Sequence, residues 1–112
     1  MSNTSANRLQ GLYVSSRRRS FMLQNGDSHE MWWWLPKDNC FLMVGEYPGN
    51  SDWQVVQTLE KKQGLFEAAR LLVEGWDLEE DRGCDEGVVA ELKEMRTRIE
   101  LDDYDYYEVT NS

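Results

Sequence analysis

The residues of this sequence that could take part in catalysis are one histidine and two cysteines. His29 is followed directly by Glu30, and a histidine beside a carboxylate can act as a general base. Both residues lie in a segment that we expect to be a strand. Neighbouring side chains of a strand point to opposite faces, so these two do not form a dyad. Cys40 and Cys84 have no second histidine to activate them. We therefore predict no catalytic residue and no enzymatic activity.

The spacing of the metal-ligating residue types does not fit the common metal and cofactor sites. A structural zinc site uses close pairs of cysteine or histidine ligands, whereas Cys40 and Cys84 lie far apart. The spacing of the acidic segment 77–86 does not fit a helix–loop–helix calcium loop, which has glycine at its sixth position and glutamate at its twelfth. Segment 45–49 lacks the lysine of a phosphate-binding loop. We expect no metal and no cofactor, and two free thiols in a cytoplasmic protein.

Charge is unevenly distributed along the chain, whose net charge is -9. Residues 1–24 carry four bases and no acid, residues 25–73 four bases and seven acids, and residues 74–112 four bases and fourteen acids. Such a gradient steers association with oppositely charged partners. The basic cluster Arg17–Arg19 could contact phosphate. Because the whole chain is acidic, we do not expect direct nucleic-acid binding.

The acidic C-terminal segment 100–108 holds five carboxylates and three tyrosines in nine positions. One interpretation is a solvated tail, and the other is a contact surface. In an extended chain, alternate residues lie about 6.6 Å apart, a spacing comparable to that of phosphates along a nucleic-acid strand. Such a surface could imitate nucleic acid toward a basic protein. On this hypothesis, the residues of this chain that contact the partner are Glu79, Glu80, Asp81, Asp102, Asp103, Tyr104, Asp105, Tyr106, Tyr107, Glu108, Trp32 and Trp34.

The run Met31–Leu35 contains three consecutive tryptophans between two other apolar residues. In a strand it places Trp32 and Trp34 on one face and Trp33 on the other, so both faces of the sheet need cover. We expect one helix to cover one face. The other face then meets a second helix, a second copy of the chain or a partner. All three tryptophans fit a core, and Trp32 or Trp34 also fits an interface anchor.

Strands must position these residues. The apolar pattern predicts strands over 19–25, 29–35 and 40–47, with a tight turn at Asn25-Gly26-Asp27. Segment 53–59 combines features of a helix start with β-favouring residues, and we predict a fourth strand there. The longest apolar runs fall far short of the ~20 residues that span a bilayer, so we expect no membrane association.

Two helices follow, over about 64–76 and 85–100, because apolar residues recur there at helical spacing. The segment 77–83 between them is predicted to be an acidic loop. The expected fold is therefore α+β, an antiparallel sheet of three or four strands packed with two helices. It forms a single domain over 1–112, with frayed ends at 1–8 and 109–112.

These features favour a non-enzymatic acidic protein that inhibits or regulates a basic protein partner by occupying its surface. A nucleic-acid-binding protein is one such partner. The main alternative is a homodimer or larger homo-oligomer with a structural role. A lesser alternative is a small-ligand binder or an enzyme that uses the region Trp32–Trp34. Inhibitors from phage or mobile elements and immunity proteins share the same general character, but no family motif is present.

Overall fold

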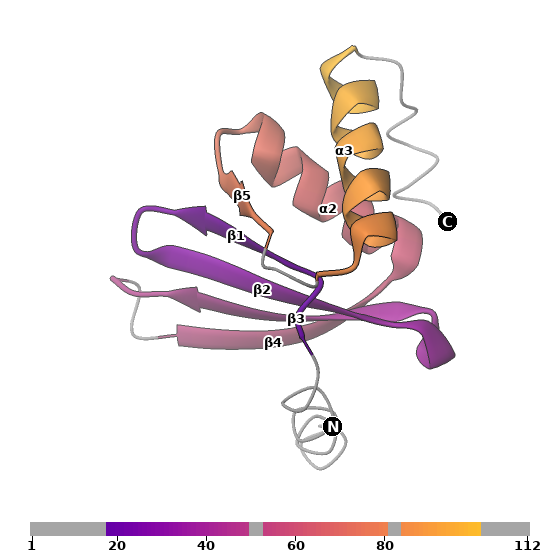
Figure 1. Cartoon of the computed structure of the whole chain (residues 1–112). Coiled ribbons are helices and arrows are strands. Elements are labelled where there is room, and N and C mark those ends of the chain that lie inside the picture. The colour runs from indigo at the N-terminus through magenta and orange to yellow at the C-terminus, as the bar shows by residue number, and fades with distance from the viewer. Residues whose placement is uncertain (1–17, 50–52, 81–83, 102–112) are drawn as a thin grey trace.

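The structure, a computed structural model, describes residues 18–49, 53–80 and 84–101. In it, one antiparallel sheet has the strand order β4-β3-β2-β1-β5. Two helices pack with this sheet, so the predicted α+β class is confirmed (Figure 1). The elements in chain order are β1 Phe21–Asn25, β2 Ser28–Leu35, a 3₁₀ turn Pro36–Asp38, β3 Cys40–Tyr47, β4 Trp53–Glu60, α2 Lys61–Val73, β5 Asp77–Glu79 and α3 Glu86–Glu100.

The first four strands form a meander of hairpins, as the apolar pattern predicts. Gly26, with a φ of 61°, turns the chain between β1 and β2. Asn39 adopts a φ of 50° and donates its backbone N–H to the carbonyl of Pro36, which directs the chain into β3. Segment 53–59, whose sequence combines features of a helix start and of a strand, belongs to a strand along its whole length, because each of its residues pairs with β3.

A fifth strand is the main departure from the predicted fold. Residues 77–79 do not belong to a loop, because Leu78 pairs with Leu23 of β1 at the sheet edge. The side chain of Leu78 packs against the core, while Asp77 and Glu79 are exposed. Three residues are too few for a strand to be recognised by its alternation. Their charges suit an edge, where they discourage pairing with other chains.

Helix α2 lies three residues earlier than predicted. It begins directly after β4, because the side chain of Glu60 accepts the backbone N–H of Gln63 at 3.1 Å and so caps the first turn. It ends where Gly75 adopts a φ of 113° and the backbone N–H of Trp76 donates to the carbonyl of Leu71. This is a Schellman arrangement, so Trp76 lies beyond the helix although it still packs against the core.

Both helices lie over the same face of the sheet (Figure 1). On this face Trp32 is 1% exposed, with its ring stacked 5.5 Å from that of Phe21 and edge-on 5.5 Å from that of Phe41. Apolar side chains of α2 and α3 complete this core, namely Leu65, Phe66, Ala68, Ala69, Leu72, Val88, Val89, Leu92 and Met95. Burial of large apolar side chains, each contributing roughly 1.5–3 kcal/mol, therefore holds the helices on this side.

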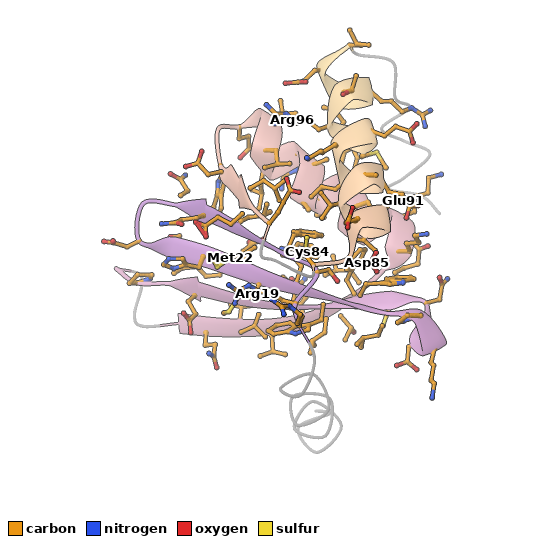
Figure 2. The ribbon with its side chains drawn as sticks, viewed as in Figure 1. Arg19, Met22, Cys84, Asp85, Glu91 and Arg96 are labelled. Atoms are coloured by element: carbon orange, nitrogen blue, oxygen red, sulfur yellow. The ribbon has the colours of Figure 1, made fainter. Side chains whose placement is uncertain are left out.

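Side chains project from both faces of the sheet (Figure 2), but neither helix covers the second face. Across the described ranges 18–49, 53–80 and 84–101, no helix is long and apolar enough to cross a membrane.

Gly64 allows α2 to approach the sheet closely, and this contact can be tested. A Cβ at Gly64 would lie 2.7 Å from Cδ2 of Phe41 and 3.3 Å from Cζ3 of Trp32. Alanine normally stabilises a helix relative to glycine. Here we expect Gly64→Ala to lower the free energy of unfolding by about 1–3 kcal/mol, because the buried rings must move. Urea denaturation measures the change.

Gly87→Ala in α3 is the matched control, since its Cβ would meet only Oδ1 of Asp85, at an ordinary 3.5 Å. We expect that substitution to be neutral or slightly stabilising. If Gly64→Ala stabilised the protein as well, the close packing of α2 against Phe41 would be wrong.

Candidate functional site

The sheet face without helices carries a continuous apolar row that runs across four strands. The pairing register places Met22 of β1 beside Met31 of β2, Met31 beside Val44 of β3, and Val44 beside Val56 of β4. Directly paired residues of antiparallel strands share a face, so these four side chains are neighbours. The two methionines and Val44 are partly buried, and Val56 is 41% exposed. This row gives the face an accessible apolar centre.

A second row beside it is more deeply buried. Trp33 pairs with Leu42, and Leu35 pairs with Cys40. Both leucines are 1% exposed and form a small cluster with Trp33 and Cys40. Among the described side chains, the indole Nε1 of Trp33 is one of two buried polar atoms with no hydrogen-bond partner. The helix-free face thus has an apolar cluster of its own.

Carboxylates border this apolar centre near both edges of the sheet. Asp77 and Glu79 of β5 lie in register with β1 and share the helix-free face with Met22. Glu46 of β3 lies on the same face near the other edge, while Glu60 at the end of β4 directs its carboxylate to the first turn of α2. All four carboxylates are exposed. An apolar centre with an acidic border is the arrangement of a protein interface with a dry core and a polar rim.

The histidine and the cysteines take no part in a catalytic arrangement within the described residues. His29 shares the helix-free face with Glu46, its register partner, whereas Glu30 lies buried on the opposite face. Burial and then the charge of Asp38 raise the pKa of the Cys40 thiol, which keeps it protonated and a weak nucleophile. Cys40 and Cys84 are both free thiols. Nor does any group of three His, Cys, Asp or Glu side chains in those residues fit a metal ion.

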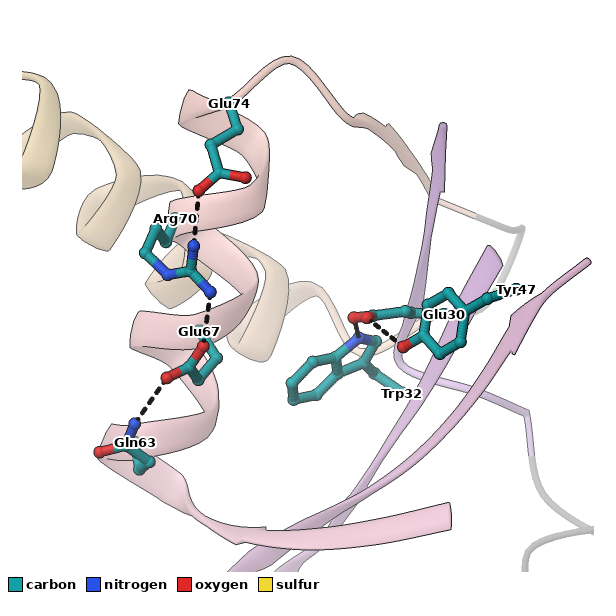
Figure 3. Close-up of polar contacts among 7 residues, drawn as sticks. All are labelled: Glu30, Trp32, Tyr47, Gln63, Glu67, Arg70 and Glu74. Carbon is teal, nitrogen blue, oxygen red and sulfur yellow. Dashed lines mark hydrogen bonds and ion pairs between the residues drawn. The ribbon is translucent and has the colours of Figure 1, made fainter. Parts of the chain in front are cut away.

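A pocket of about 400 Å³ lies on the helix side, between the sheet and α2. Its volume is within the range of ligand pockets, roughly 300–1,000 Å³. Sheet residues form one wall and α2 residues the other, and Figure 3 draws the hydrogen-bonded residues of each wall. The residues that line it are Glu30, Trp32, Met43, Tyr47, Gln57, Leu59, Gln63, Glu67, Arg70 and Leu71.

Glu30 is the polar centre of the sheet wall. It is 7% exposed, and its two carboxylate oxygens accept from Nε1 of Trp32 at 3.2 Å and from the hydroxyl of Tyr47 at 2.5 Å. Gly45 makes room for this contact, because a Cβ there would lie 2.2 Å from the Tyr47 hydroxyl. Burial, and then the hydrogen bond to Glu30, raise the pKa of Tyr47 well above its usual range. Two neutral groups therefore hold a buried carboxylate.

The α2 wall is a chain of paired polar groups (Figure 3). The amide of Gln63 donates to Glu67 at 2.9 Å. Arg70 donates to Glu67 at 3.0 Å and to Glu74 at 2.5 Å. The hydrogen bond to Glu67 is the largest cause of the raised pKa of Arg70. The carboxylates of Glu67 and Glu74 thus compensate the positive charge of the Arg70 guanidinium.

Four of the residues that the sequence assigns to a partner lie within the described ranges, namely Trp32, Trp34, Glu79 and Glu80. Trp32 belongs to the core, and Trp34 is partly buried beside Phe41 with the ammonium of Lys61 5.3 Å from its ring centroid. Glu79 and Glu80 are exposed, and Glu80 pairs with Lys93 at 2.9 Å. The remaining assignments, Asp81, Asp102, Asp103, Tyr104, Asp105, Tyr106, Tyr107 and Glu108, lie outside the described residues.

From the sequence alone, the region Trp32–Trp34 is named only as a lesser alternative for ligand binding, and Met22, Tyr47 and the pocket residues of α2 are not singled out. Alternation along Met31–Leu35 does predict two apolar faces, but it does not show which face the helices leave open. Comparison with known proteins gives no match: no protein family, no curated protein and no solved structure is similar to this chain.

The hydrogen bond between Tyr47 and Glu30 can be tested through stability and its dependence on pH. Tyr47→Phe removes one donor to a buried carboxylate, so we expect it to lower the free energy of unfolding by about 1–3 kcal/mol at neutral pH. The folded state raises the pKa of Tyr47 from its ordinary 10.0. The stabilisation is therefore complete below pH 10 and decreases above it, because the phenol of the unfolded chain ionises first.

Urea denaturation of both proteins from pH 7 to pH 11 measures this difference. It should be constant up to about pH 10 and shrink beyond that value. A difference that does not change across the whole range would contradict the assigned hydrogen bond.

Proposed function

We propose that this protein is a non-enzymatic binding protein that inhibits or regulates a basic protein partner by covering its surface. The observation that carries the proposal is the helix-free sheet face, where an apolar row is bordered by exposed carboxylates. Trp33 and Met31 are the proposed anchors, since large and adaptable side chains dominate binding energy, and the exposed Val56 extends the apolar row to the edge strand. The cytosol is the proposed compartment.

Charge complementarity favours a basic partner. The chain carries a net charge of -9, and Asp77, Glu79 and Glu46 lie beside the apolar row. Exposed acids at the border of an interface accelerate the encounter with a cationic surface and add less to the final affinity. On this proposal, the acids of 100–108 add to the same field, in the manner of a nucleic-acid mimic.

The position of the interface can be tested with photo-crosslinking residues. We expect a crosslinker at Val56, on the helix-free face, to capture a partner, whereas one at the exposed Ala90 of α3 should not. With the captured partner purified, its association rate should fall as salt rises from low to physiological concentration. A crosslink from Ala90 alone, or a rate indifferent to salt, would overturn the proposal.

A charge-matched pair of double variants sharpens this test. Asp77→Asn with Glu79→Gln should slow association about tenfold at low salt, because it removes two charges from the border. Glu86→Gln with Glu94→Gln changes the net charge equally but alters only α3, and should have a much smaller effect. Equal effects of the two would contradict a specific role for the border.

The same experiment tests the alternative of a homo-oligomer. If the crosslinker at Val56 joined two copies of the chain, and sedimentation at micromolar concentration gave a dimer, the helix-free face would be a self-association surface. That result would replace a foreign partner with a second copy.

A further inference from the structure

The pocket between the sheet and α2 is a separate place from the helix-free face, because the two lie on opposite sides of the sheet. Trp32 and Glu30 face the pocket, while Met31 and Trp33 point to the other side. Binding at one place therefore does not require binding at the other. The pocket can be considered as a site of its own.

The charges of the pocket walls indicate which ligands fit. Among the described residues, Glu30 contributes a carboxylate that accepts from the neutral indole and phenol given above. Glu67 contributes a second carboxylate, and Arg70 contributes one positive charge that is bound to Glu67 and Glu74. The lining thus carries two carboxylates against one guanidinium, which is already paired with Glu67 of the lining and with Glu74. An anionic ligand would face net repulsion here.

The remaining surface of the pocket also suits a cation with an apolar body. A carboxylate has about four acceptor positions on its two oxygens, so Glu30 retains capacity for a further donor. The ring of Trp32 and the side chains of Met43, Leu59 and Leu71 line the space around it. Apolar side chains of this kind cover the alkyl stem of a cation, while the buried carboxylate bonds its charged group.

We propose that this pocket binds an organic cation, a single guanidinium or primary ammonium on a short apolar stem, whose charged group bonds to Glu30. The cation can be a free small molecule or the side chain of an arginine or lysine on another protein. In both cases Glu30 supplies the charge, Tyr47 and Trp32 fix its carboxylate, and Gln57 and Gln63 at the mouth offer neutral polar contacts.

The probe for this site is n-butylguanidinium, titrated into the full chain and followed by amide and indole N–H resonances. Its control is n-butylurea, which has nearly the same shape and no charge. We expect saturable shifts at residues of the pocket, with butylguanidinium bound at least about tenfold more tightly than butylurea, because a hydrogen bond between charged groups is stronger than one to a neutral group. Equal affinity for the two probes, or no saturable shift from butylguanidinium, would overturn the proposal.

Glu30→Gln retains the shape of the side chain and removes its charge, so the preference for the cation should disappear. Glu94→Gln, an exposed position on α3, makes the same change in net charge and should leave the preference intact. If Glu30→Gln fails to fold, Gln57→Trp provides a second variant, since it fills the mouth of the pocket from an exposed strand position and keeps every charge. Undiminished binding of butylguanidinium to Gln57→Trp would overturn the proposed location.

A comparison of two cations separates the two sources. N-acetyl-arginine amide presents the guanidinium as a protein does, with backbone on both sides. If it binds at least as tightly as butylguanidinium, the pocket accepts a side chain of another protein; if it binds much more weakly, the pocket accepts a free small molecule. The double variant at Asp77 and Glu79 should bind both probes unchanged, so failure of the partner interface would not be mistaken for failure of this site.

Discussion

The packing of aromatic rings on one face of the sheet is the constraint on which the rest of the structure depends. Phe21, Trp32 and Phe41 come from three adjacent strands and meet edge-on or stacked, and α2 lies against Trp32 and Phe41 at Gly64. Because this cluster draws both helices to one side, neither helix covers the second face (Figure 1). The same arrangement shapes the pocket, since Trp32 belongs at once to the core and to the pocket wall.

The hydrogen bonds of the pocket wall follow from the packing of this core. Trp32 is buried, yet its indole N–H has a partner because Glu30 lies two residues earlier on the same face. The carboxylate of Glu30 in turn has a second hydrogen-bond donor, because Gly45 leaves room for the side chain of Tyr47 to reach it. The Trp32 indole, the Glu30 carboxylate and the Tyr47 hydroxyl thus each have a hydrogen-bond partner. The cost of burying the carboxylate is offset by donors that carry no charge.

The meander, its hairpins and both helices could be predicted from the sequence, because the short apolar runs in 29–35 and 40–47, bounded by turn residues, and the helical spacing in 85–100 are strong local signals. The strand 77–79 could not, because its pairing with β1 depends on where α2 returns the chain. The boundaries of α2 shifted because Glu60 caps the helix from within a strand, a role that residue type alone does not reveal. The candidate sites were the least predictable part, since the partnership of Glu30 with Tyr47 joins residues 17 positions apart.

The direct junction of β4 and α2 has a mechanical consequence. Glu60 ends the strand and Lys61 begins the helix, with no residue between them to act as a hinge. The direction in which the strand leaves the sheet therefore fixes the axis of the helix. Residues of both elements line the pocket. Because the strand continues directly into the helix, the distance between the two pocket walls is set by the fold before a ligand binds. A cavity framed in this way favours molecules of one size and loses little entropy when it is filled.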